Sequence, residues 1–249
     1  MLRYDFHIHT EYCGHAPGMK VADIVAAADK LNLDAICIAD HIYSDRELAT
    51  VEVIRKELKQ VDTDCKVIVG GEIDVDGSFS DGRLVTDRLD EIDYIVAAIH
   101  YIPSAGNYPF APDDCPYEPA EMLSRWRDTL LGLLSNKRID TLAHPGRMIG
   151  AAVNMDVFFD DVLAVFAEAA ALSVANNIAW ELNELTGSRL SEYYCNQWHK
   201  IYEIAVSAGI KIIYGSDAHQ LALIGANTFS KMILKKLPHN SLTTPNILH

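Results

Sequence analysis

The segment LRYDFHIHTEYCGH, residues 2–15, starts as an apolar strand and ends with three histidines. The run LRYDFHI at 2–8 predicts a β-strand, and His7 and His9 lie at its end, with His15 shortly after. Because residues i and i+2 of a strand point to the same face, His7 and His9 can bind one ion as a pair. Three of the chain's ten histidines lie in this segment, which indicates a metal site or a proton relay.

Six further short runs rich in Val, Ile and Ala repeat the pattern of the first. They are DAICIA (34–39), KVIVGG (66–71), DYIVAAI (93–99), IDTLA (139–143), IAWEL (178–182) and IKIIYG (210–215). Helical patterns lie between them, with apolar faces at Val21, Ile24, Ala28 and Leu31, at Met122, Trp126, Leu130 and Leu133, and at Tyr194, Trp198, Ile201, Ala205 and Ala208. Strands that alternate with helices are typical of repeated βαβ units. The sequence therefore predicts an α/β protein with a parallel sheet, closed into a barrel or doubly wound.

The length and composition indicate one globular domain. A chain of 249 residues is long enough for one sizeable α/β core, and no linker or low-complexity tract divides it. We therefore expect a single domain over residues 1–249. The net charge of −14 disfavours a broad nucleic-acid surface, although bound metal could still attract a small anion locally.

The sequence indicates a cytoplasmic protein without a membrane span. The opening MLRYDFHIHT lacks the pattern of a signal peptide, and the most apolar stretch, at 162–175, is too short to span a bilayer. The five cysteines are scattered and form no CxxC pair, which suggests free thiols in a reducing compartment. Cys13 could ligate a metal, but imidazole and carboxylate groups dominate its surroundings, so we expect a bystander thiol.

Most histidines fall where a predicted strand ends. In a parallel barrel the carboxyl ends of all strands converge on one rim, so side chains distant in sequence meet there. Imidazole with carboxylate suits Zn²⁺, Mn²⁺ or Fe²⁺. A catalytic zinc takes about three protein ligands, so nine candidates imply two or three metal ions. The candidate metal ligands are His7, His9, His15, His41, Glu72, His100, His144, Asp217 and His219.

These segments together resemble the PHP superfamily, named for its polymerase and histidinol phosphatase members. The matching pieces are HIHT (7–10), His15, ADH (39–41), GGE (70–72), IH (99–100), AHPG (143–146) and SDAH (216–219). The resemblance implies a distorted seven-stranded (β/α)7 TIM-like barrel and a trinuclear site. The three ions it implies are bound by His7, His9, Glu72 and Asp217, by Glu72 as a bridge with His100 and His144, and by His15, His41 and His219.

A site of this kind predicts an enzyme that hydrolyses a small-molecule phosphate ester, as a phosphatase or phosphodiesterase. Two or three divalent ions can bind phosphate oxygens and supply a metal-bound hydroxide that attacks phosphorus. We expect Glu72 to orient the bridged ions and Asp217 to move a proton while remaining a ligand. Arg147, in HPGR, is placed either to clamp the phosphate or to pair with an acid at the rim. Asn183, at the end of the sixth strand, is a second candidate for substrate binding.

Three other functions fit parts of the pattern. A histidinol-phosphate phosphatase is the narrower alternative, but the resemblance implies an aspartate two residues after the fifth-strand histidine, where this chain has Gly146. An amidohydrolase also opens with HxH, but it would need a bridging lysine or carboxylate on a middle strand. A non-catalytic metal-dependent binding domain would bind ions without turnover. The proline-rich segment 101–119 is expected to be a long loop at the mouth of the pocket.

Overall fold

The seven expected strands are all present in the computed structural model, which describes residues 2–102, 108–109 and 117–249. Each strand pairs in parallel with its neighbours. They are β1 (Tyr4–Ile8), β2 (Ala35–Ile38), β4 (Lys66–Val69), β6 (Ile95–Ala98), β9 (Thr141–Leu142), β10 (Ala179–Asn183) and β11 (Ile212–Gly215).

Two of these strands bend and continue as separate short strands. β3 (His41–Ile42) follows β2, and β5 (Gly71–Asp74) follows β4. The bends divide the ladder into a sheet of order β1-β2-β4 and a sheet of order β11-β10-β9-β6-β5-β3. Gly70 lies at the second bend, where an added Cβ would be only 2.6 Å from Cys37 Sγ and 2.7 Å from the carbonyl oxygen of Tyr94. A side chain at this bend would push the strands apart, so the distortion depends on glycine.

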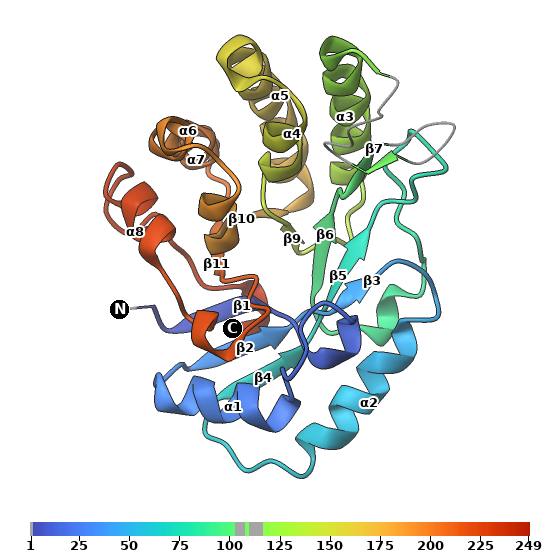
Figure 1. The fold of residues 1–249 in the computed structure, drawn as a ribbon, viewed down its shortest axis with the longest axis vertical. Helices are drawn as coiled ribbons and strands as arrows, with labels where there is room; N and C mark the ends of the chain where they lie inside the picture. The colour runs from blue at the N-terminus through green and yellow to red at the C-terminus, as the bar shows by residue number, and fades with distance from the viewer. Residues whose placement is uncertain (1, 103–107, 110–116) are drawn as a thin grey trace.

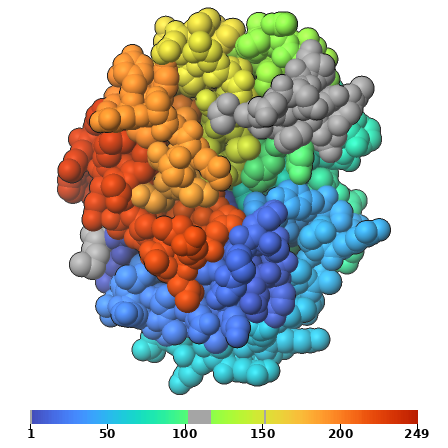
Figure 2. All heavy atoms as spheres, viewed as in Figure 1, coloured from blue at the N-terminus to red at the C-terminus, as the bar shows by residue number. Residues whose placement is uncertain are grey.

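The last strand returns to the first. Just beyond the two strands, Ile8 and Ala218 form a parallel bridge. The Asp217 N–H donates to the His7 carbonyl at 2.8 Å, and the His9 N–H donates to the Ala218 carbonyl at 3.0 Å. The last strand thereby lies beside the first, and the expected α/β fold of a distorted seven-stranded (β/α)7 barrel is confirmed over the described residues. On the surface, a blue N-terminal segment lies beside a red C-terminal segment (Figure 2).

Helices surround the strands (Figure 1). Those of the first half are α1 (Val21–Lys30), α2 (Leu48–Leu58) and α3 (Pro119–Leu134). Those of the second half are α4 (Arg147–Ala152), α5 (Met155–Asn176), α6 (Glu192–Gln197), α7 (His199–Ala208) and α8 (Thr228–Leu234). Short 3-10 turns are η1 (Glu11–Cys13), η2 (Leu89–Glu91), η3 (Glu184–Ser188), η4 (Leu221–Leu223) and η5 (Asn246–Leu248).

The expected apolar faces pack against the strands, with two exceptions. Trp126 and Leu130 of α3 are buried, as is Trp198 at the junction of α6 and α7. Leu31 is wrong as a core residue because it lies one residue beyond the end of α1 and is 43% exposed. Ala208, the last residue of α7, is also exposed. Both errors arise where a helix ends and the periodic pattern stops describing the backbone.

The expected loop at 101–119 is only partly described. Its first residues form β7 (Tyr101–Ile102), which pairs antiparallel with β8 (Tyr108–Pro109), and Pro119 is the first residue of α3. Residues 103–107 and 110–116 lie outside the described residues, so the role of this segment stays a prediction. Within the described residues, no helix has the length and apolar character needed to cross a membrane.

Candidate metal centre

Eight of the nine expected ligands converge at the carboxyl ends of the strands. Sets of three of these ligands offer nitrogen or oxygen atoms within 4.8 Å of one another. The sets are His7, His9 and Asp217; His9, His41 and Glu72; and Glu72, His100 and His144. His219 belongs to a further set with His9 and Cys13. The directional argument from strand ends therefore brings these side chains together.

Glu72 lies at the middle of this arrangement. Its partner in the β3–β5 ladder is His41, so the two side chains start from adjacent positions. Glu72 Oε2 is 2.7 Å from His41 Nδ1, 3.4 Å from His7 Nε2 and 3.6 Å from His9 Nε2. The other oxygen, Oε1, is 2.8 Å from His144 Nε2 and 3.4 Å from His100 Nε2. One carboxylate thus faces five imidazoles and can bridge two ions.

Several buried atoms of this cluster have no hydrogen-bond partner. Of the five such side-chain atoms in the described residues, four are His7 Nε2, His9 Nδ1, His41 Nδ1 and Glu72 Oε2, and the fifth is Trp198 Nε1. A buried polar atom without a partner costs roughly 1–3 kcal/mol, so such atoms are rarely left together. Ligand atoms that converge in this way without hydrogen bonds match a site built to bind cations.

Hydrogen bonds orient three of the imidazoles. His7 Nδ1 donates to Glu181 Oε1 at 2.7 Å, and His100 Nδ1 donates to Asp74 Oδ2 at 2.8 Å. His219 Nδ1 donates to the carbonyl of Asp217 at 3.0 Å. These oxygens can only accept, so Nδ1 carries a hydrogen and Nε2 is the atom left to ligate a cation. Partners of this kind fix the tautomer and orientation of metal-binding histidines.

Glu181 is the functional residue that the sequence reasoning missed. It comes from β10, for which the sequence suggested no metal ligand and only Asn183 as a substrate-binding candidate. Its Oε2 accepts from the His144 N–H at 2.6 Å, while Oε1 binds His7. Gly215 on the neighbouring strand leaves room for it, because an added Cβ would be only 2.1 Å from Glu181 Oε1. An acid in the middle of the apolar run IAWEL was the signal that could have identified it.

Asp74 and Asp5 also support the centre. Asp74 was not considered, although it lies two residues after Glu72 and therefore shares its face of the strand. Asp5 accepts from the N–H groups of Ser216 at 2.8 Å and Gly225 at 2.9 Å. It thereby ties β1 to the segment that carries Asp217.

The backbone is strained at two expected ligands. Asp217 has φ 56° and His144 has φ 28°, both in the left-handed region. Non-glycine residues rarely adopt such angles, and they persist where the surroundings hold them, often at functional sites. Here the backbone hydrogen bond to β1 holds Asp217, and Glu181 holds His144.

His15 is the expected ligand that the structure places apart. It is exposed, and it belongs to none of the close sets found within the described residues. Its ring lies 5.3 Å from that of His41, so it borders the cluster. Cys13, which we expected to be a bystander, lies closer to His9 and His219.

A cavity of about 660 Å³ opens over the cluster. Its walls include His100, Asp217 and Arg147, together with Tyr43 and Tyr101. This volume suits a small molecule.

Comparison with known protein families shows the family to which the chain belongs. A family model described as the PHP domain matches residues 5–185. The chain belongs to the PHP domain family. A Clostridium acetobutylicum protein named as a probable phosphatase is 25% identical over 226 residues, covering 89% of this chain and 80% of that protein.

Two solved structures share the fold of this PHP protein. A Listeria monocytogenes protein assigned as a histidinol phosphatase has a TM-score of 0.63 at 19% identity, with 91% of this chain and 99% of that chain covered. An amidohydrolase from Burkholderia multivorans has a TM-score of 0.51 at 14% identity, with 98% and 94% covered.

The two expected substrate-binding residues of the PHP site both contact Asp217. Arg147 is 7% exposed, lines the cavity and forms an ion pair with Asp217 Oδ2. Asn183 is fully buried and donates to the same oxygen at 3.2 Å, while its own Oδ1 accepts from the Thr186 N–H. Burial raises the pKa of Asp217, but Arg147 and His7 hold it well below its ordinary value. Asp217 is therefore ionised, which suits a ligand better than a proton acceptor.

The charge of the site calls for cations. Counted as ionised, five carboxylates, one guanidinium and the protonated rings of His7 and His100 leave two negative charges in this buried region. Burial lowers the pKa of His9 to about 3 and that of His144 to about 4, so both rings are neutral at neutral pH. Buried charge must be compensated, and three divalent ions would convert the site to a net positive one. The carboxylates and the guanidinium are those of Glu72, Asp217, Glu181, Asp74, Asp40 and Arg147.

Metal binding at neutral pH is expected to release about two protons per chain from His7 and His100, since bound protons must leave these ligand nitrogens first. Burial lowers the pKa of His7, but Glu181 and Glu72 raise it well above its ordinary value; for His100, Asp74 likewise overcomes burial and raises the pKa to about 8. Both rings are thus protonated in the metal-free protein, and metal affinity should rise with pH until they titrate. Zinc added in weak buffer with a pH indicator measures the release. His100→Asn should release about one proton fewer, and no release from either protein would contradict the assignment.

Proposed function

We propose that this chain is a metal-dependent phosphoesterase that hydrolyses a small-molecule phosphate ester at a trinuclear centre. The observation that carries the proposal is the position of Glu72, whose two oxygens lie within 3.6 Å of five imidazole nitrogens. The family membership and the probable phosphatase name of the clostridial relative support the same class of reaction. We extend the proposal to a single PHP-type domain over residues 1–249 and to the cytoplasmic location expected from the cysteine pattern.

The residues present fit two or three divalent ions. The unpartnered nitrogens and carboxylate oxygen are ligands that Zn²⁺, Mn²⁺ and Fe²⁺ all accept. Such ions lower the pKa of water and neutralise charge on the phosphoryl group. His7, His9 and Asp217 would hold one ion, with Glu72 as the bridge towards His100 and His144. His41 and His219 would hold the third, with the expected ninth ligand, His15, at its exposed side.

The chain's own residues would bind and orient the substrate. The cavity opens directly over the cluster, so a phosphate group can enter while the rest of the molecule contacts Tyr43 and Tyr101. One guanidinium N–H of Arg147 can donate to a phosphate oxygen while a second N–H stays bound to Asp217. Asn183 is buried behind this pair and would act through Asp217, which it positions. The net charge of −14 opposes a long polyanion, so we propose a small substrate and not a nucleic acid.

Arg147→Lys is expected to raise KM for the phosphate ester about tenfold or more, because a hydrogen bond to a charged group contributes roughly 1.5–3 kcal/mol. Lysine keeps a charge beside Asp217 but cannot make two parallel hydrogen bonds. The metal content should stay unchanged. Steady-state kinetics measure the effect. The control is Arg138→Lys, because Arg138 is an exposed arginine that is paired with Asp90. A fall in metal content with unaltered KM would show that Arg147 only supports Asp217.

A panel of phosphate monoesters and diesters tests the proposed function. The metal-free protein should be inactive, and addition of Zn²⁺, Mn²⁺ or Fe²⁺ should restore turnover of at least one member. Amide substrates in the same panel test the amidohydrolase alternative, which is supported only by a fold shared with a solved amidohydrolase. Bound metal without turnover of any ester would favour a non-catalytic binding domain.

Histidinol phosphate is the second candidate substrate. The Listeria protein assigned as a histidinol phosphatase supports it, whereas Gly146 stands where we expected that branch to have an aspartate. Growth of a histidine auxotroph that lacks this phosphatase, when it carries this chain, would establish the activity.

A further inference from the structure

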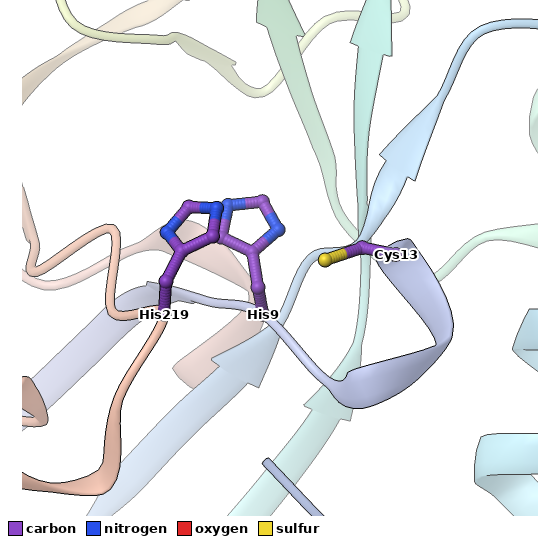
Figure 3. A group of neighbouring side chains, drawn as sticks. All are labelled: His9, Cys13 and His219. Atoms are coloured by element: carbon purple, nitrogen blue, oxygen red, sulfur yellow. The ribbon is translucent and has the colours of Figure 1, made fainter. Parts of the chain in front are cut away.

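Cys13 lies against the metal centre, at the end of η1. Thr10 caps this turn by accepting from the Tyr12 N–H, and Gly14 follows with φ 77°. The Cys13 sulfur and one nitrogen each of His9 and His219 lie within 4.8 Å of one another. Figure 3 shows the sulfur directed towards the imidazole of His9, and the ring of His219 packs against that of His9 with centroids 4.2 Å apart.

His9 has a nitrogen that lacks a partner on the side of Cys13. Its Nε2 is 3.2 Å from Asp217 Oδ1, but its Nδ1 has no hydrogen bond. The side chain is fully buried, and the nearest printed charge to Nδ1 is Asp40 Oδ1 at 3.9 Å. In Figure 3 one ring nitrogen of His9 faces the sulfur of Cys13. A buried nitrogen that has no hydrogen-bond partner and faces a thiol favours a cation bound by both groups.

The other two groups are prepared for the same cation. His219 Nδ1 donates to the Asp217 carbonyl, so its Nε2 keeps a free lone pair. The N–H of His15 donates to Cys13 Sγ at 3.4 Å. Burial outweighs this contact and raises the pKa of the Cys13 thiol to about 11, so the thiol would ionise only when it binds a cation. His15 itself is exposed and offers no comparably close nitrogen.

We propose that Cys13 is a thiolate ligand of the third ion, which it shares with His9 and His219. The inference rests on the proposed metal centre and adds sulfur to its donors. On binding, the Cys13 S–H bond and the His9 N–H bond break and both protons leave to solvent. The sulfur and the second nitrogen of His9 would then form bonds to the third ion, so that His9 bridges the first and third ions as an imidazolate. Sulfur is a soft donor, so this position prefers Zn²⁺ or Fe²⁺ to Mn²⁺.

Cobalt substitution tests the proposal without an activity assay. The protein reconstituted with cobalt(II) chloride should show a sulfur-to-cobalt charge-transfer absorption in the near ultraviolet, in addition to weak visible bands. Cys13→Ser should lose the ultraviolet absorption and keep visible bands. Cys195→Ser is the matched control, since Cys195 is also half-buried but donates to the Gly187 carbonyl. Visible bands without the ultraviolet absorption in the unmutated protein would overturn the role of Cys13 and leave the metal centre intact.

Thiol protection gives a second readout that needs no variant. Iodoacetamide followed by peptide mapping should label Cys13 in the metal-free protein at least about tenfold faster than in the zinc-loaded protein, because the labelling rate follows free thiolate. Labelling of Cys195 should not depend on zinc. Equal labelling of Cys13 in a protein that has bound zinc would overturn the proposal, whereas failure to bind zinc at all would refute the metal centre itself.

Discussion

Glu72→Gln should abolish metal-dependent phosphoesterase activity, with a loss above about 10³-fold, the upper end of what removal of one electrostatic group costs. Burial raises the pKa of Glu72, but His41, His7 and His100 hold it well below its ordinary value. It is therefore an ionised ligand in contact with histidines of every proposed ion. Glutamine has nearly the same shape but no charge, and its NH2 group cannot bind a cation. Elemental analysis and turnover of an aryl phosphate measure the two losses.

The matched control for this variant is Glu168→Gln. Glu168 is partly exposed and pairs with Arg127 on the helical surface, so its removal should change neither metal content nor turnover. Circular dichroism of both variants checks that the fold is intact. A folded Glu72→Gln protein with full metal content and full turnover would contradict the assignment of Glu72.

Glu181→Gln should lower metal affinity about 10- to 100-fold, the usual effect of losing a group that orients a metal ligand. Each oxygen of Glu181 accepts one hydrogen bond, from His7 Nδ1 and from the His144 N–H. Glutamine has an NH2 group in place of one carboxylate oxygen. This NH2 group would face the N–H of either His7 or His144, so one of the two hydrogen bonds would be lost. Because the ligands themselves remain, excess zinc should restore activity, which distinguishes a positioning residue from a ligand.

Glu184→Gln is the control for Glu181. Glu184 follows β10 and accepts from two backbone N–H groups, those of Phe229 and Ser230, at 2.8 Å each. The same substitution there should lower thermal stability and leave zinc affinity unchanged. Equal zinc affinity in Glu181→Gln and the unmutated protein would show that Glu181 has only a structural role.

The strands and most ligands were predictable because two local rules act together. A short apolar run predicts a strand, and parallel strands bring their carboxyl ends to one rim. His100 and His144, for example, follow directly after such runs. This reasoning uses only the order of the residues and does not depend on how neighbouring strands align.

The supporting residues depended on information that the sequence does not carry. Glu181 reaches His7 because β10 and β11 pair in one register and Gly215 leaves space for its oxygen. The separation of His15 from the cluster depends on the left-handed turn at Gly14. The break that produces β5 likewise depends on packing at Gly70, which no periodic pattern reveals.

Elemental analysis of the purified protein tests the central claim most directly, because the cluster has a function only if it binds cations. We expect two or three equivalents of zinc, manganese or iron per chain, falling by at least one equivalent in Glu72→Gln. A folded protein that binds no divalent ion, even after dialysis against zinc, manganese and iron, would contradict the account.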